Sequence, residues 1–158
     1  MEKVVLQSKL LDCQIEIYKR QFENLMAAEP LKYSDWPNAE TDYLRKSAGI
    51  YYFFERKPES SLPLYVGKAG YGGGKWSLYK RLSQHFQVSQ QNTILGKMTS
   101  SSSCPAKMVK TSLSNTEVYL QWIAICSNPI DASPDLNSEL IWIECFFKSI
   151  LKPRYTDA

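Results

Sequence analysis

The sequence is poor in the residues that build metal clusters and membrane segments. It contains one histidine, His85, and none of its apolar runs approaches the roughly 20 residues that a membrane-spanning helix needs. A single histidine excludes a site built from several histidine ligands. The first residues, MEKVVLQSKLLD, contain only the short apolar run VVL, which is too short for the core of a signal peptide. These absences predict a cytoplasmic protein without a membrane partner.

The cysteine and glycine patterns exclude two further classes. The four cysteines are far apart in the sequence and form no CxxC pair, so neither a zinc ribbon nor a disulfide framework is indicated. The segment GYGGGKWS at 70–77 has the glycine content of a phosphate-binding loop, but a P-loop requires GxxxxGK followed by Ser or Thr. Trp76 stands at that last position. We interpret the segment as a turn that precedes a helix.

Acidic residues are absent from one long segment of the chain. Between Ser60 and Thr116 there is no Asp or Glu, although the formal net charge of the whole chain is only +3. Such a basic block favours a polyanionic partner, and we expect DNA to bind there. A solvated, serine-rich loop is the alternative interpretation of the same segment. The candidate DNA contacts are Lys75, Lys80, Lys97, Lys107 and Lys110.

The N-terminal part of the chain has helical periodicity. At 158 residues the chain has the length of one domain with its own core. Apolar residues recur every three or four positions over residues 4–27, which predicts an amphipathic helix. We expect this helix and the linker after it to pack on the domain, although its apolar stripe also suits pairing with a second copy. The stripe consists of Leu11, Ile15, Tyr18, Phe22 and Leu25.

Three strands and two helices are predicted in the rest of the chain. Aromatic and β-branched residues predict strands at Ile50–Glu55 and Leu64–Val66, and apolar alternation predicts a third strand within 116–126. A helix with Ser77 as its N-cap and a closing helix that ends before Pro153 complete the set. This order predicts an α/β (α+β) fold with a small, mainly antiparallel, three-stranded central sheet flanked by helices.

Two tripeptides and two later residues resemble a known family. GIY at 49–51 is followed by YVG at 65–67, then by a helix in KRLSQHF that carries Arg81, and then by Glu144 on the closing helix. This order and spacing resemble the GIY-YIG nuclease superfamily, and most of all its compact restriction endonucleases. The resemblance covers Ser47–Ala158.

The resemblance implies a division of the chain and a chemistry. Residues 1–46 would form the N-terminal helix and linker, and residues 47–158 would form one compact GIY-YIG-like nuclease domain. Members of this superfamily hydrolyse phosphodiester bonds with a divalent cation, so an endonuclease that uses Mg²⁺ or Mn²⁺ is implied. The implied site residues are Tyr51, Tyr65, Lys68, Arg81, His85 and Glu144.

Each implied role answers a requirement of phosphodiester hydrolysis. Glu144 would hold the metal ion, and the Arg81 guanidinium would donate hydrogen bonds to two phosphate oxygens at once. Tyr51 and Tyr65 would flank the attacking water, one as general base and the other as the group that orients it. A base role requires a cation that lowers the pKa of a tyrosine from about 10. Lys68 is the candidate for that cation, and His85 is a second helper in proton handling.

The implied function is a restriction-type endonuclease that cuts duplex DNA. A homodimer is the expected assembly, because two strands need two sites. A structure-selective or DNA-repair nuclease is the alternative enzyme. A DNA-binding module of the same fold without activity is the other alternative, and Thr156 favours it because the family commonly has asparagine at that place. Tyr52 alternates with Tyr51 along the strand, so we expect Tyr52 to pack on the opposite face of the sheet.

Overall fold

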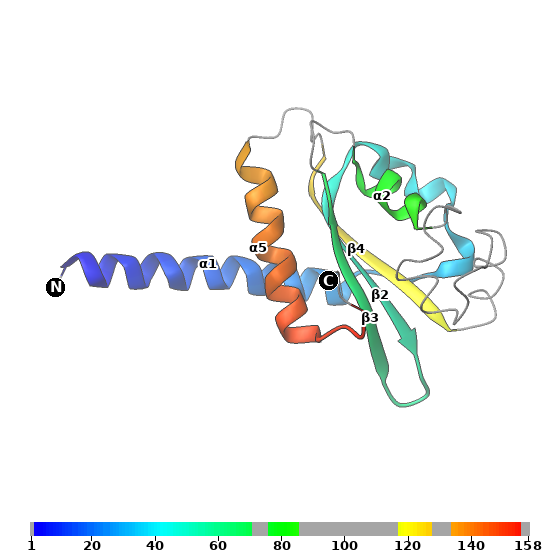
Figure 1. Ribbon diagram of the computed structural model, residues 1–158, viewed down its shortest axis with the longest axis horizontal. Coiled ribbons are helices and arrows are strands. Elements are labelled where there is room, and N and C mark those ends of the chain that lie inside the picture. The colour runs from blue at the N-terminus through cyan, green and yellow to red at the C-terminus, as the bar shows by residue number, and fades with distance from the viewer. Residues whose placement is uncertain (1, 71–75, 86–116, 128–133, 156–158) are drawn as a thin grey trace.

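The computed structural model describes residues 2–70, 76–85, 117–127 and 134–155, which form an α+β arrangement (Figure 1). Its elements are α1 (Glu2–Ala27), β1 (Leu31–Lys32), the 3-10 helices η1 (Tyr33–Asp35) and η2 (Ala39–Lys46), β2 (Ala48–Arg56), β3 (Ser61–Ala69), α2 (Leu78–Gln84), β4 (Val118–Cys126) and α5 (Pro134–Leu151). No helix in these ranges combines the length and the apolar content that crossing a membrane requires.

The strands form one antiparallel sheet in the order β1-β4-β2-β3. The predicted α+β class is confirmed, but the sheet of the described residues has four strands instead of the predicted three. The additional strand is β1, in which Leu31 pairs with Leu120 of β4. The sequence predicts a loop there because Pro30 and Pro37 flank the segment, and a strand of two residues shows no periodicity.

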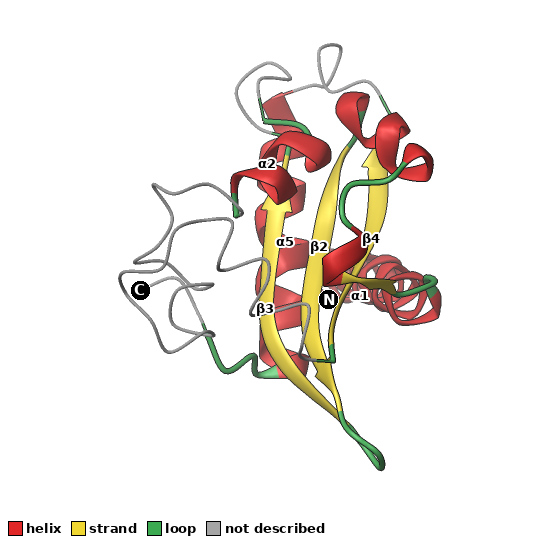
Figure 2. Ribbon diagram, turned by 90° about the vertical axis from the view of Figure 1, so that its right-hand side faces the viewer, coloured by secondary structure: helices red, strands yellow, loops and turns green. Residues whose placement is uncertain are grey.

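Both faces of the sheet are covered, with α2 in front of it and α5 behind it in Figure 2. Side chains of β2 alternate between these faces. Tyr51 and Phe53 belong to the α2 face, whereas Ile50, Tyr52 and Phe54 belong to the face covered by α5 and α1. All five are buried. The uninterrupted apolar run of β2 therefore follows from its central position, because side chains that point either way enter a core.

The β2–β3 hairpin is tighter than the sequence suggests. The eight residues RKPESSLP predict a loose connection, but β2 extends to Arg56 and β3 already begins at Ser61. Lys57 and Ser60 close the turn by hydrogen bonds between their backbones. Pro63 is tolerated inside β3 because β3 is an edge strand and the register shifts beside this residue.

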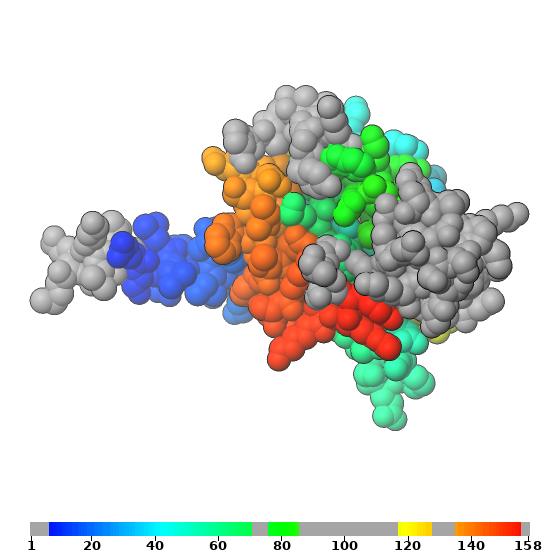
Figure 3. Space-filling model, viewed as in Figure 1, coloured from blue at the N-terminus to red at the C-terminus, as the bar shows by residue number. Residues whose placement is uncertain are grey.

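Helix α1 extends far beyond the rest of the domain (Figures 1 and 3). Its C-terminal half packs on α5, where the rings of Phe22 and Phe147 meet edge to face with centroids 5.3 Å apart. Leu11 and Ile15, which belong to the same predicted stripe, are 60% and 43% exposed. The expected packing of this helix on the domain is therefore limited to its C-terminal half.

Candidate active site

Two tyrosines from neighbouring strands lie together on the α2 face of the sheet. Tyr51 of β2 and Tyr65 of β3 are both buried, and their ring centroids are 5.9 Å apart. Tyr52 lies on the opposite face, where its ring stacks on that of Phe54. The prediction that Tyr51 and Tyr65 share one face, and that Tyr52 packs on the other, is confirmed.

Gly67 makes room for the ring of Tyr51. The two residues are paired in the β2–β3 register. A Cβ atom at Gly67 would overlap the phenol end of Tyr51 and would also press on the ring of Tyr65. The Tyr51 side chain therefore passes directly over the β3 backbone toward the edge of the sheet. The last glycine of the YVG motif has a steric role, since its missing side chain determines where the Tyr51 hydroxyl lies.

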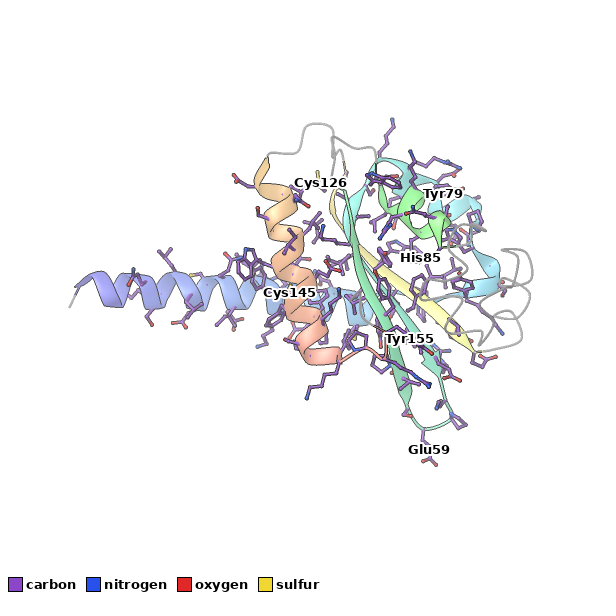
Figure 4. The ribbon with its side chains drawn as sticks, in the orientation of Figure 1. Glu59, Tyr79, His85, Cys126, Cys145 and Tyr155 are labelled. Carbon is purple, nitrogen blue, oxygen red and sulfur yellow. The ribbon has the colours of Figure 1, made fainter. Side chains whose placement is uncertain are left out.

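His85 encloses the tyrosine pair from the side of α2. The hydroxyl of Ser77 caps this helix by accepting a hydrogen bond from the Lys80 amide, and His85 follows the last turn. Its Nε2 lies 2.9 Å from the Tyr51 hydroxyl oxygen, and its ring centroid is 5.6 Å from that of each tyrosine. The imidazole is buried and lies between α2 and the sheet (Figure 4).

Arg81 lies one turn before His85 on α2, as their four-residue spacing predicts. Its Nη1 donates a hydrogen bond of 2.5 Å to Oε1 of Gln84, and its guanidinium is only partly exposed. Burial raises the pKa of the Tyr51 hydroxyl, and the positive charge of Arg81 opposes that rise. The structure thus brings Arg81, His85 and Tyr51 together from two elements, as expected for a common site.

The Tyr51 hydroxyl is influenced by several groups at once. Burial is the largest effect, and it raises the pKa of Tyr51 well above the ordinary value of a tyrosine. The charge of Arg81 and a hydrogen bond with Tyr65 lower this pKa, whereas the negative charge of Glu144 raises it. The net result is a hydroxyl that stays protonated at neutral pH. The same interactions show that Arg81 and Glu144 both lie within electrostatic range of it.

Glu144 enters the site from α5 together with a lysine. The carboxyl side chain is buried, and its Oε1 lies 2.9 Å from the ammonium nitrogen of Lys148, one helical turn further on. That nitrogen is 6.0 Å from the centroid of the Tyr65 ring. Glu144 was predicted from the sequence, whereas Lys148 was not. The four-residue spacing of opposite charges on one helix was the signal that could have identified it.

Lys68 is directed away from the tyrosine hydroxyls. Alternation along β3 places it on the same side as Val66, which belongs to the α5 face, and its Nζ donates a hydrogen bond of 3.3 Å to Oδ1 of Asn137. The expectation that Lys68 lowers the pKa of a catalytic tyrosine therefore does not fit this geometry. Successive side chains of a strand alternate between the two faces of the sheet. Lys68 and Tyr65 are three positions apart, so their side chains lie on opposite faces.

The C-terminal segment is attached to the edge of the sheet beside Tyr65. The backbone amides of Arg154 and Tyr155 donate hydrogen bonds of 3.0 Å and 2.9 Å to the carbonyl groups of Pro63 and Leu64. Tyr155, labelled in Figure 4, packs against the core of the α2 face. These bonds satisfy backbone groups of an edge strand and hold the strand that carries Tyr65.

Only part of the expected DNA surface lies in the described residues. Lys80 is exposed on α2, and its Nζ lies 5.3 Å from the centroid of the Trp76 ring. Outside the described ranges lie Thr156 and the other predicted DNA contacts, Lys75, Lys97, Lys107 and Lys110.

The donor groups at the site fit one kind of metal ion. Across the ranges that the structure describes, no three histidine, cysteine or carboxylate side chains gather to hold a metal. Glu144 is a single carboxylate whose charge acts on the Tyr51 hydroxyl. This set does not fit Zn²⁺, which needs three or four protein ligands. It fits Mg²⁺ or Mn²⁺, because such hard cations accept one or two carboxylates and complete their shell with water and substrate phosphate.

Comparisons of the chain with protein-family models, curated proteins and solved structures give no match. The site is therefore interpreted from its own geometry and from the spacing of its motifs.

Proposed function

We propose that this protein is a metal-dependent DNA endonuclease that hydrolyses phosphodiester bonds. The observation that carries the proposal is the surroundings of one hydroxyl group. The Tyr51 hydroxyl oxygen lies 2.9 Å from His85 Nε2 and interacts electrostatically with Arg81 and Glu144. A proton acceptor, a fixed cation and a carboxylate around one hydroxyl are the groups that this reaction requires. The spacing of the GIY and YVG motifs supports the same reaction.

Tyr51 acts as a proton relay. Because burial raises its pKa, the ionised form is not populated at neutral pH. With Nε2 of His85 unprotonated, the Tyr51 hydroxyl donates its proton to this nitrogen while its oxygen accepts a proton from the attacking water. The water proton thus passes through Tyr51 to His85, and the hydroxide oxygen attacks phosphorus. Tyr65, whose ring lies 5.9 Å from that of Tyr51, orients the water.

Arg81 and Glu144 have the task of stabilising the negative charge that develops on the phosphate during hydrolysis. The planar guanidinium of Arg81 binds two phosphate oxygens at once, which a lysine ammonium does not do. It stabilises the additional charge that develops when phosphorus becomes five-coordinate. Glu144 would hold Mg²⁺ or Mn²⁺ in this scheme, and such an ion, when bound, would supply neutralisation of the developing negative charge.

Duplex DNA is the substrate that we favour, in a restriction-type reaction. Lys80 and the basic residues between 60 and 116 would hold its backbone, because phosphate contacts position a nuclease on DNA. A homodimer would present one such site to each strand. A structure-selective or repair nuclease would use the same chemistry on a different DNA shape, and DNA substrates of different shapes distinguish the two.

A cleavage panel tests the function. The protein is incubated with plasmid DNA and with linear, branched and damaged oligonucleotides, in Mg²⁺, in Mn²⁺ or with a chelator. We expect metal-dependent cleavage of the plasmid to defined fragments, and no cleavage by Glu144→Gln or Arg81→Ala. Cleavage of branched or damaged substrates alone would identify the structure-selective or repair nuclease. DNA binding without cleavage, unchanged by Glu144→Gln, would identify an inactive binding module and overturn the mechanism.

A further inference from the structure

One ion pair is much less exposed than the others in the described residues. The side chains of Lys148 and Glu144 are 24% and 11% exposed, whereas each of the other pairs keeps at least one side chain more than half exposed. Solvent and salt weaken an exposed pair, but they screen a partly buried pair much less. Any other cation that binds the Glu144 carboxylate therefore has to displace Lys148 or share the carboxylate with it.

The Lys148 ammonium has two neighbours, the Glu144 carboxylate and the Tyr65 ring. It lies 2.9 Å from Oε1 of Glu144 and 6.0 Å from the centroid of the Tyr65 ring. Both neighbours attract a cation, the carboxylate by its charge and the ring by its quadrupole. A side chain with two such partners has a defined position.

This position conflicts with the role of Glu144 in the proposed function. Glu144 is the carboxylate that fits a divalent cation, and one of its oxygens is already in an ion pair with Lys148. A carboxylate whose charge is balanced attracts a second cation less strongly. Lys148 and a metal ion next to the same oxygens would also repel each other.

We propose that Lys148 is a resident counter-ion of Glu144 and competes with a divalent cation for this carboxylate. The inference rests on the proposed function and adds a regulation of its metal site. In the free protein, Lys148 keeps the affinity for metal low. A bound phosphodiester offers Lys148 another anion next to the site, so that the release of Glu144 is coupled to the arrival of substrate.

The binding of Mn²⁺ to the protein without DNA measures this competition directly. Free Mn²⁺ has an electron paramagnetic resonance signal that is lost on binding, so a titration gives the Kd without any turnover. Lys148→Met removes the charge and keeps an apolar stem of similar length. We expect it to lower the Kd for Mn²⁺ by about threefold to tenfold. Lys148→Arg keeps a cation and should remain within about twofold of the wild type.

Two controls make the result specific. Lys57→Met removes the same charge from the exposed β2–β3 turn and should leave the Kd unchanged. Lys148→Gln repeats the loss of charge if Lys148→Met does not fold, as judged by circular dichroism. A Kd that is unchanged or higher in the folded, uncharged variant overturns the counter-ion role.

Glu144→Gln distinguishes the failure of this inference from the failure of the proposed function. If this variant binds Mn²⁺ as the wild type does, the ion is not held by Glu144, and both the metal site and the counter-ion role are overturned. If Glu144→Gln abolishes binding while Lys148→Met and Lys148→Gln bind no more tightly than the wild type, the metal site stands and only the counter-ion role is overturned.

Discussion

The burial of Tyr51 determines which chemistry its hydroxyl can perform. A tyrosine that acts as a base by ionising needs a cation that outweighs desolvation, and here desolvation is the larger effect. The hydrogen bond to His85 offers another route, because a neutral hydroxyl can accept one proton while it donates another. In the proposed mechanism the partner of Tyr51 is therefore a proton acceptor, and the nearby Arg81 would bind the phosphate.

Tyr51→Phe tests this relay, because it removes the hydroxyl and keeps the ring. We expect the single-turnover cleavage rate to fall by about 100-fold or more, the size of a lost general-base contribution. The DNA affinity should change little. Tyr52→Phe is the matched control, since it removes the same atom from the adjacent residue on the opposite face of the sheet. Equal losses in both variants would contradict the assignment of Tyr51.

Gly67→Ala should displace the hydroxyl without removing it. The added methyl group would overlap the ring of Tyr51, so we expect the free energy of unfolding to fall by about 1 to 3 kcal/mol, as in other overpacked cores. Cleavage should be lost as well. Urea unfolding followed by circular dichroism measures the change in stability.

A double variant shows whether the Tyr51 ring is the cause. Tyr51→Leu removes the ring atoms that the new methyl group of Gly67→Ala would meet. The two substitutions together should therefore cost less stability than the sum of their separate effects. Additive effects would mean that the methyl group is accommodated without moving the ring.

Helix α1 consists of two halves that differ in what stabilises them. Its C-terminal half is held by contacts with α5, such as that between Phe22 and Phe147. Its other half exposes Leu11 and Ile15. Isolated helices of about 12 residues are marginal in water, so packing decides how firmly each half is held.

Two alanine substitutions in the same apolar stripe measure this difference. Phe22→Ala should lower the free energy of unfolding by roughly 2 kcal/mol or more, because it removes a ring that packs on Phe147. Ile15→Ala should cost less than about 1 kcal/mol, since Ile15 is 43% exposed. Chemical denaturation measures both values. Similar losses would show that the exposed half also packs in solution, and sedimentation velocity would then reveal whether a second copy covers it.

The elements with local signals are the ones that the sequence predicts well. Helix α2 follows its predicted N-cap, Ser77, and α5 ends before Pro153 as predicted, because capping and proline act within a single turn. Strand β1 and the full length of β3 depend on partner strands that are distant in sequence. The periodicity of a short segment does not reveal such pairing. The sequence therefore predicts no strand at β1 and only the central part of β3.

The same distinction applies to the site. The four-residue spacing of Arg81 and His85 predicts their common face, since helical spacing is a local property. Lys68 was placed beside Tyr65 by its proximity in sequence, although strand alternation directs the two side chains to opposite faces. The contact of Lys148 with Tyr65 joins α5 to β3, and only the tertiary structure reveals it.

Across the whole molecule, buried tyrosines occur on both faces of the sheet. Tyr33 and Tyr51 lie on the α2 face and Tyr52 on the α5 face. Burial raises the pKa of all three, and it raises that of Tyr52 to about 12. In the unfolded chain a tyrosine titrates near pH 10. Between about pH 10 and the higher folded values, the unfolded chain has therefore released protons that the folded protein still holds.

This difference predicts a loss of stability at high pH. The contribution of these tyrosines is fully present below about pH 10 and is lost as the pH rises through their folded pKa values. Each can reduce the free energy of unfolding by at most about 1.4 kcal/mol per pH unit. Tyr52→Phe removes one such group and keeps the ring that stacks on Phe54, so its stability should fall less steeply than that of the wild type between about pH 10 and 12.

Urea unfolding of the wild type and of Tyr52→Phe, at several pH values above and below 10, measures the two slopes. The comparison cancels the titration of lysines, which both proteins share. Tyr43→Phe is the control for the loss of a hydroxyl group by itself, because it makes the same change at an exposed ring. Identical slopes for the wild type and Tyr52→Phe would contradict the prediction. They would mean that the Tyr52 hydroxyl is accessible to water in the folded protein, so that packing on the α5 face does not raise its pKa.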